Sequence, residues 1–153
     1  MGAYPSCVRK SPKFQPSAAP LSAGVVVVRR SAEGWRVLLL RVYNYWDFPK
    51  GLVEDGEDPL STARREAREE TTLDDLEFAW GDSFVETEPY GRAKKVARYY
   101  VARTKTEAIK LPVSPELGRP EHHEWRWCDF ETAGQLVNDR LWKVLRWAQD
   151  VVE

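Results

Sequence analysis

The chain has 153 residues, of which 42% are hydrophobic and 31% are charged, and its formal net charge is −1. That length suits one domain with a buried core, and the near-zero charge excludes a general electrostatic attraction to nucleic acid or membrane surfaces. The two cysteines, Cys7 and Cys128, are too few for a disulfide framework, and no apolar run approaches the roughly 20 residues of a membrane-spanning helix. We therefore expect a cytoplasmic protein with no membrane partner.

The N-terminal part divides into an arm and a hairpin. Residues 1–20 carry four prolines among serines and lysines, which predicts an extended arm ahead of a folded domain at 21–153. The run of small and β-branched residues at 23–28 predicts a strand buried on both faces. A turn at 31–34 then leads to a second predicted strand at 35–42, so the two strands form a hairpin.

The middle of the chain predicts a loop and then a helix. Residues 43–51 are expected to form a loop that ends in Pro-Lys-Gly. Asp58 is a good N-cap and Pro59 suits the first helical position, so a helix should run from there to about Thr71.

The rest of the chain mixes both element types. Strands are predicted near 77–87, 95–104 and 124–130, with a long loop at 111–120. An apolar stripe at helical spacing predicts one or two helices over 130–152. Because strands and helices alternate irregularly, the expected class is α/β with a mixed sheet.

The predicted helix carries a ridge of carboxylates. On a helix that advances about 100° per residue, Glu66, Glu69 and Glu70 fall in one sector, next to a sector of small residues that includes Ala63 and Ala67. The ridge should therefore lie at the seam between core and solvent. Clustered carboxylates repel one another, and they are the oxygen ligands that hard divalent ions select. A solvated face of salt bridges is the alternative interpretation.

The sequence around this helix decides between a metal site and a solvated face of salt bridges. From residue 51 the sequence reads GLVEDGEDPLSTARREAREETTL, which resembles the Nudix box, G-x5-E-x7-R-E-U-x-E-E-x-G-U, with U a bulky aliphatic residue. The matching positions are Gly51, Glu57, Arg65, Glu66, Glu69, Glu70 and Leu73. Ala67 stands where a larger aliphatic residue is usual, and Thr72 replaces the last glycine. Since a β-branched residue fits a left-handed backbone poorly, we expect a differently shaped loop after the helix.

The resemblance implies a Nudix fold, a mixed β-sheet sandwiched between α-helices, that hydrolyses a nucleoside diphosphate linked to a further moiety. It implies Mg²⁺ or Mn²⁺ held by Glu66, Glu69 and Glu70, with a backbone carbonyl at or before Gly51. By the same resemblance, Glu57 and Arg65 brace the box.

Family members often draw a further glutamate, as base or ligand, from a downstream loop. Glu116, Glu121 and Glu124 are the candidates, and we prefer Glu121 because it stands just before a predicted strand. His122 and His123, the only histidines, are interpreted as loop or substrate-edge residues, since a zinc site would need more ligands.

Other segments bear on the substrate. The stretches WDFPKG, KKVARYYVA and HHEWRW are similar to those of asymmetric diadenosine tetraphosphate hydrolases, in which an aromatic ring stacks on adenine. By alignment Tyr99 fits that place, with Tyr43 and Trp46 as further candidates; stacking contributes about 1–3 kcal/mol per base. Lys50 can reach a phosphate as a point charge, and Arg92 belongs to a basic segment that can contact a polyphosphate or RNA.

Three functions stay open. The first is hydrolysis of a dinucleoside polyphosphate, and the second is removal of pyrophosphate from 5′-triphosphorylated RNA. The third, from a different class, is a nucleotide sensor that does not hydrolyse its ligand. Either a monomer or a homodimer is compatible with the sequence.

Overall fold

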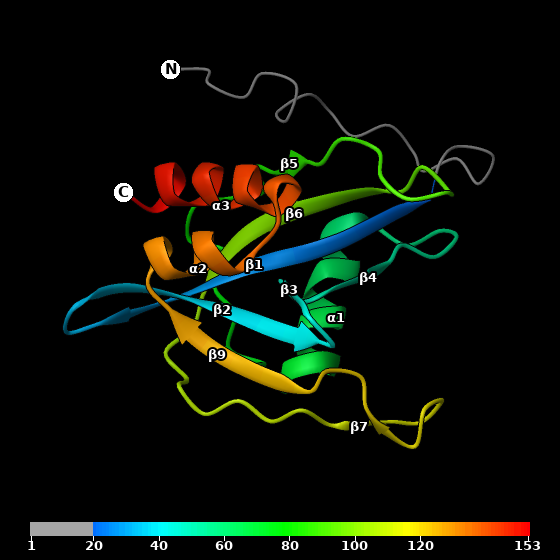
Figure 1. Ribbon diagram of the computed structural model, residues 1–153, viewed down its shortest axis with the longest axis horizontal. Helices are drawn as coiled ribbons and strands as arrows, with labels where there is room; N and C mark the ends of the chain where they lie inside the picture. The colour runs from blue at the N-terminus through cyan, green and yellow to red at the C-terminus, as the bar shows by residue number, and fades with distance from the viewer. Residues whose placement is uncertain (1–19) are drawn as a thin grey trace.

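The computed structural model describes residues 20–153 and contains one seven-stranded mixed sheet covered by helices (Figure 1). The predicted arm, apart from Pro20, lies outside these residues. The elements in chain order are β1 (Leu21–Ser31), β2 (Gly34–Val42), β3 (Tyr45–Asp47), β4 (Lys50–Leu52), α1 (Pro59–Thr71), β5 (Val85–Glu86), β6 (Val96–Arg103), β7 (Val113–Ser114), β8 (Arg119–Pro120), β9 (Glu124–Cys128), α2 (Phe130–Leu136) and α3 (Asp139–Val152).

Strand β1 is the centre of the sheet. It pairs antiparallel with β2, which confirms the predicted hairpin, and parallel with β6 over residues 21–28. The valines at 25–28 are completely buried, as a strand covered on both faces requires. The short strand β4 pairs with the start of β1, and β9 pairs with β2.

The helices cover both faces, so the expected α/β sandwich is confirmed (Figure 1). On one face, Leu141 and Leu145 of α3 pack in a cluster with Val26 of β1. On the other face, Ala63 and Ala67 of α1 form a cluster with the opposite side of the sheet. None of the helices among residues 20–153 is long and apolar enough to cross a membrane.

Two predicted loops contain strands. The loop at 43–51 includes β3 and the start of β4, while the loop at 111–120 closes a small β7–β8 hairpin. The close approach of β4 to β1 depends on Gly24, where an added Cβ would lie 2.4 Å from the carbonyl oxygen of Pro49. In contrast, the predicted strand at 77–87 shrinks to β5 and an isolated bridge from Glu77 to Arg103.

Helix α1 begins as predicted and ends differently. Asp58 caps it by accepting a hydrogen bond from the Ser61 N–H, and Pro59 is its first residue. At its end Thr72 adopts φ 64°, so the left-handed turn is kept although the residue is β-branched. The expectation of a reshaped loop is therefore wrong: the turn is retained, and the threonine bears a conformational cost of about 1–2 kcal/mol.

Candidate active site

The three box glutamates of α1 are buried to different degrees. The side chain of Glu70 is 7% exposed, that of Glu66 is 17% exposed and that of Glu69 is 55% exposed. The small residues Ala63 and Ala67 on the adjoining helix face are fully buried. The carboxylate ridge thus runs from the protein interior to solvent along the seam expected from the sequence.

Strand β4 holds the two buried glutamates. A Cβ added to Gly51 would lie 2.0 Å from Cδ of Glu66, so that carboxylate occupies the space that the missing side chain leaves. The Lys50 N–H donates to Oε1 of Glu70 at 3.3 Å. Glycine at 51 is therefore required by close approach, because any side chain would displace Glu66.

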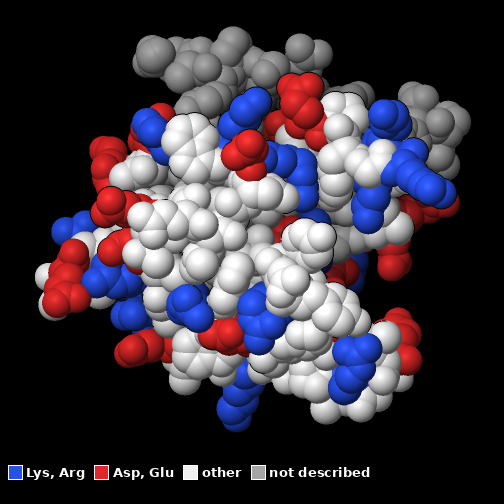
Figure 2. Space-filling view, in the orientation of Figure 1, with Lys and Arg blue, Asp and Glu red and all other residues white. Residues whose placement is uncertain are grey.

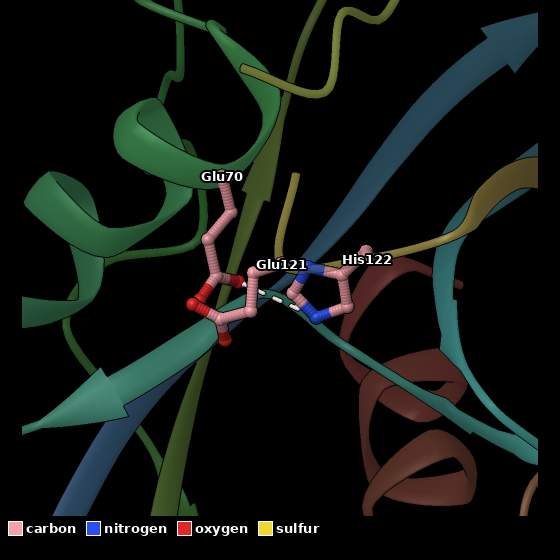
Figure 3. Close-up of side chains that lie close together, drawn as sticks. All are labelled: Glu70, Glu121 and His122. Atoms are coloured by element: carbon pink, nitrogen blue, oxygen red, sulfur yellow. Dashed lines mark ion pairs between the residues drawn. The ribbon is translucent and has the colours of Figure 1, made fainter. Parts of the chain in front are cut away.

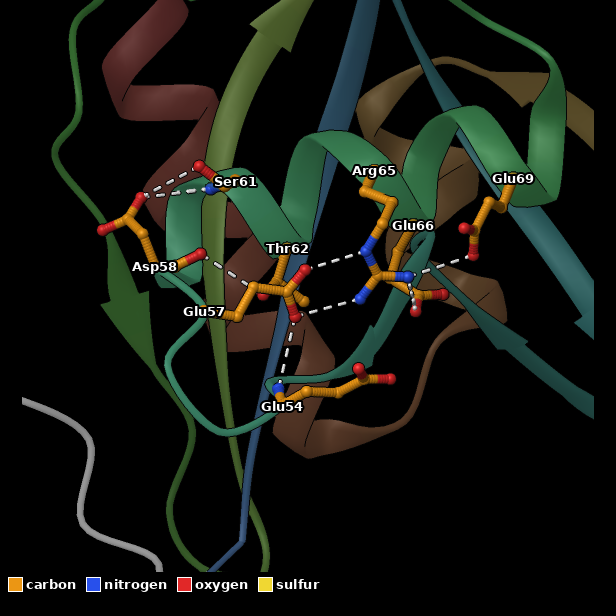
Figure 4. A network of polar contacts seen from close by, with 8 residues as sticks. All are labelled: Glu54, Glu57, Asp58, Ser61, Thr62, Arg65, Glu66 and Glu69. Carbon is orange, nitrogen blue, oxygen red and sulfur yellow. Dashed lines mark hydrogen bonds and ion pairs between the residues drawn. The ribbon is translucent and has the colours of Figure 1, made fainter.

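Arg65 ties the box together (Figure 4). Its guanidinium donates two hydrogen bonds to Glu57, at 2.8 and 3.0 Å, and further bonds to Glu66 at 3.0 Å and Glu69 at 3.1 Å. The Arg65 bond lowers the pKa of Glu57 to about 2. These are the contacts of a brace, since the fork-shaped guanidinium fixes three carboxylates at once.

A loop residue distant in sequence completes the cluster. One carboxylate oxygen each from Glu70 and Glu121 and a ring nitrogen of His122 lie within 4.8 Å of one another (Figure 3). The other downstream candidates lie differently. Glu124 accepts hydrogen bonds from Arg41 and Arg126, while Glu116 borders the hollow and accepts from the Ser114 hydroxyl.

The cluster is electrostatically unfavourable without a cation. Burial, followed by the charges of Glu121 and Glu66, raises the pKa of Glu70 well above its usual value. Burial also raises the pKa of Glu66. Carboxylates that repel one another in a partly buried site are suited to a divalent ion, which would neutralise them. Glu66, Glu70 and Glu121 are the oxygen donors that would hold it.

A hollow of about 490 Å³ opens over these groups. One wall is the carboxylate ridge of α1, and the other is the segment 111–116 with Glu121 and His122. In Figure 2 the molecule is hollowed at the right, above the β7–β8 segment, and acidic and basic side chains are interleaved over the rest of this face. The hollow has room for a phosphate group together with metal.

The structure corrects the expected role of Tyr99. Its side chain is fully buried, and its ring packs edge-on against Phe48, with ring centroids 5.3 Å apart. Its hydroxyl donates to Oδ1 of Asp47 at 2.9 Å. Stacking on a base needs an open ring face, so Tyr99 anchors Asp47 instead. Asp47 in turn accepts a 2.6 Å bond from the Lys50 ammonium, which holds that cation beside the site.

The other substrate candidates lie around the site to different degrees. Tyr43 is 63% exposed and its ring meets His123 edge-on at 5.1 Å, one residue from the cluster. Trp46 is partly buried, and Arg126 lies over its ring at 4.7 Å. Arg92 is exposed on the turn at 91–94 and does not line the hollow. Tyr43 and Trp46 stay predictions, and so does a substrate contact by Arg92, which is not among the residues that line the hollow.

Sequence reasoning missed two residues. His122, interpreted as an edge residue, is 10% exposed and faces Glu70. Asp47 received no role, although it bonds both Tyr99 and Lys50. The signals were present, since Asp47 lies in the stretch before the box and His122 follows Glu121, but only the fold shows which way each side chain points.

The comparisons with known proteins agree with this geometry. The NUDIX domain model matches residues 19–148. The chain belongs to the Nudix family. It is 32% identical over 123 residues to the asymmetrical bis(5′-nucleosyl)-tetraphosphatase of Caenorhabditis elegans, covering 76% of this chain and 84% of that protein. It is 26% identical over 138 residues to an RNA pyrophosphohydrolase of Bartonella henselae, covering 76% and 79%.

Solved Nudix structures show the same fold. A binary complex of C. elegans Ap4A hydrolase superposes with a TM-score of 0.75 at 26% identity, covering 87% of this chain and 97% of that one. The NUDIX domain of Shewanella oneidensis NrtR, complexed with ADP ribose, superposes with a TM-score of 0.67 at 18% identity over 92% and 94% of the two chains. At that identity the likeness is one of fold alone.

Proposed function

We propose that this Nudix protein uses Mg²⁺ or Mn²⁺ to hydrolyse a pyrophosphate bond in a dinucleoside polyphosphate such as diadenosine tetraphosphate. The observation that carries the proposal is the convergence of Glu66, Glu70 and Glu121 on one hollow. Two of these come from the box helix and one from a loop about 50 residues further along the chain. The relationship to the C. elegans tetraphosphatase supports the substrate class.

The residues divide the chemistry among themselves. A divalent metal supplies neutralisation of phosphate charge and a lowered pKa for bound water. Glu66 and Glu70 would hold the metal, with the exposed Glu69 and the Gly51 carbonyl as further donors. Glu121 lies beside Glu70 in the cluster; one of its carboxylate oxygens would bind the metal and the other would accept a proton from the attacking water. The Lys50 ammonium would leave its ion pair with Asp47 and contact a phosphate oxygen.

The second candidate substrate is 5′-triphosphorylated RNA. The relationship to the RNA pyrophosphohydrolase of B. henselae favours it, and that relationship covers as much of this chain as the tetraphosphatase does. The basic segment that suggested an RNA contact consists of Arg92, Lys94, Lys95 and Arg98. These residues do not form one surface, however. Arg98 is 7% exposed, bonds Glu86 and lies over the Phe84 ring. We therefore rank the dinucleoside polyphosphate first.

One assay tests the proposal. Tag-free protein is supplied with Mg²⁺ or Mn²⁺ and either diadenosine tetraphosphate or 5′-triphosphorylated RNA, and kcat/KM is compared. We expect the higher value for diadenosine tetraphosphate and at least a 100-fold loss in Glu70→Gln. Glu33→Gln, on the exposed hairpin turn, is the matched control. Preference for RNA would select the second substrate, and binding without turnover of either would select the sensor.

A further inference from the structure

His122 is a buried polar side chain without a hydrogen-bond partner. Its side chain is 10% exposed, and within residues 20–153 neither ring nitrogen makes a hydrogen bond. The ring lies beside the carboxylates, as Figure 3 shows, and its Nε2 is 4.0 Å from Oε1 of Glu70. A mostly buried imidazole usually has a hydrogen-bond or metal partner, so its position beside the carboxylates suits a ligand between these groups.

The distances suit a shared metal ion. A separation of 4.0 Å is too long for a hydrogen bond. Metal–donor bonds of about 2.1 Å, however, place two donors of one ion about 3–4.2 Å apart. Glu121 contributes a third donor atom in the same cluster, within 4.8 Å of the other two. The three donors are therefore close enough to bind one ion after small movements of their side chains.

The neighbouring histidine is bound differently. Nδ1 of His123 accepts a hydrogen bond from the Tyr43 N–H at 3.2 Å, and its ring packs on Tyr43. One of the chain's two histidines thus has a hydrogen-bond partner in the protein, while the other lies beside Glu70 and Glu121 with no hydrogen bond to the part of the chain that the structure describes. This contrast provides a matched control for any experiment on His122.

We propose that His122 is a nitrogen ligand of the divalent metal, together with Glu70 and Glu121, and that it shifts the site's preference from Mg²⁺ toward Mn²⁺ or a similar transition ion. Mg²⁺ favours all-oxygen surroundings, whereas imidazole nitrogen suits transition metals. The inference rests on the proposed function only in assuming that this cluster binds a divalent cation.

Pulsed electron paramagnetic resonance of the Mn²⁺-loaded protein, without nucleotide and without a histidine tag, tests the ligand directly. We expect ¹⁴N modulation from one imidazole in the parent protein and in His123→Asn, and none in His122→Asn. Labelling histidine with ¹⁵N should change the parent's pattern, and because this chain has only two histidines the assignment is unambiguous. A Mn²⁺-bound parent without nitrogen modulation overturns the proposal, even if a variant does not fold.

Calorimetric titration supplies the second measurement. We expect His122→Asn to lower the affinity for Mn²⁺ relative to Mg²⁺ by roughly tenfold or more, because even mutation of residues that only support metal ligands typically costs about 10–100-fold in affinity. An unchanged ratio contradicts the metal preference. Failure of the proposed function would be a separate result. In that case the Mn²⁺-loaded parent would still show nitrogen modulation, but neither Mg²⁺ nor Mn²⁺ would support hydrolysis. Failure of this inference alone would leave Mg²⁺-dependent hydrolysis intact in the parent.

Discussion

The hydroxyl of Tyr99, buried in the core, donates a 2.9 Å hydrogen bond to Asp47, and Asp47 also binds the Lys50 ammonium. Replacing Tyr99 by phenylalanine keeps the ring but leaves one carboxylate oxygen of Asp47 with less support. We expect a loss of about 1 kcal/mol in the free energy of unfolding, together with a higher KM as Lys50 loosens. Denaturant unfolding and steady-state kinetics measure the two. If KM and stability were both unchanged, the hydroxyl would have no anchoring role.

Glu70 should trade stability for function. Its pKa is raised in the folded protein, so folding is most favoured where Glu70 is protonated, below its unfolded pKa near 4.5, and that contribution is lost as pH rises through the folded pKa. Glu70→Gln removes the charge, and we expect the metal-free variant to melt roughly 2–4 °C higher than the parent at pH 8.

Near pH 4, where the parent's Glu70 is also protonated, the difference in Tm should vanish. Added Mn²⁺ should raise the Tm of the parent and have little effect on the variant. Differential scanning calorimetry across this pH range makes the comparison. A variant less stable than the parent at pH 8 would contradict the charge-repulsion account.

Gly51→Ala should separate activity from folding. The new Cβ would meet the carboxylate of Glu66, which is the far end of a flexible side chain, so the carboxylate would move while the backbone stays. We expect metal affinity and kcat/KM to fall at least tenfold with a change in stability below about 1 kcal/mol. Gly134→Ala, whose Cβ would make only 3.4 Å contacts with Trp142, is the control.

Thr72→Gly should stabilise the protein. The residue sits at φ 64°, where a β-branched side chain is strained and glycine is not. Glycine also adds conformational entropy to the unfolded chain, which offsets part of the gain. We expect the free energy of unfolding to rise by about 0.5–1 kcal/mol, seen as a higher urea midpoint. Thr72→Ala keeps a Cβ in the strained region and should gain much less. Equal gains in both variants would point to the hydroxyl rather than the backbone.

The sequence by itself determined the elements whose signals are local. The valine run, the cap at Asp58 with Pro59, and the spacing of Glu66, Glu69 and Glu70 each act within one strand or one helix, so they could be predicted without the fold. The box pattern likewise indicated the family, because its matching positions lie on one continuous segment.

The tertiary structure decided what depends on contacts between distant segments. Tyr99 and Tyr100 are adjacent in the sequence, and only the sheet shows that the first is buried against Phe48, where no base can stack. The pairing of β4 with β1 brings Gly51 against Glu66, and the loop before β9 brings His122 to Glu70. Such contacts join residues far apart in the chain, and their geometry follows from packing rather than from local propensity.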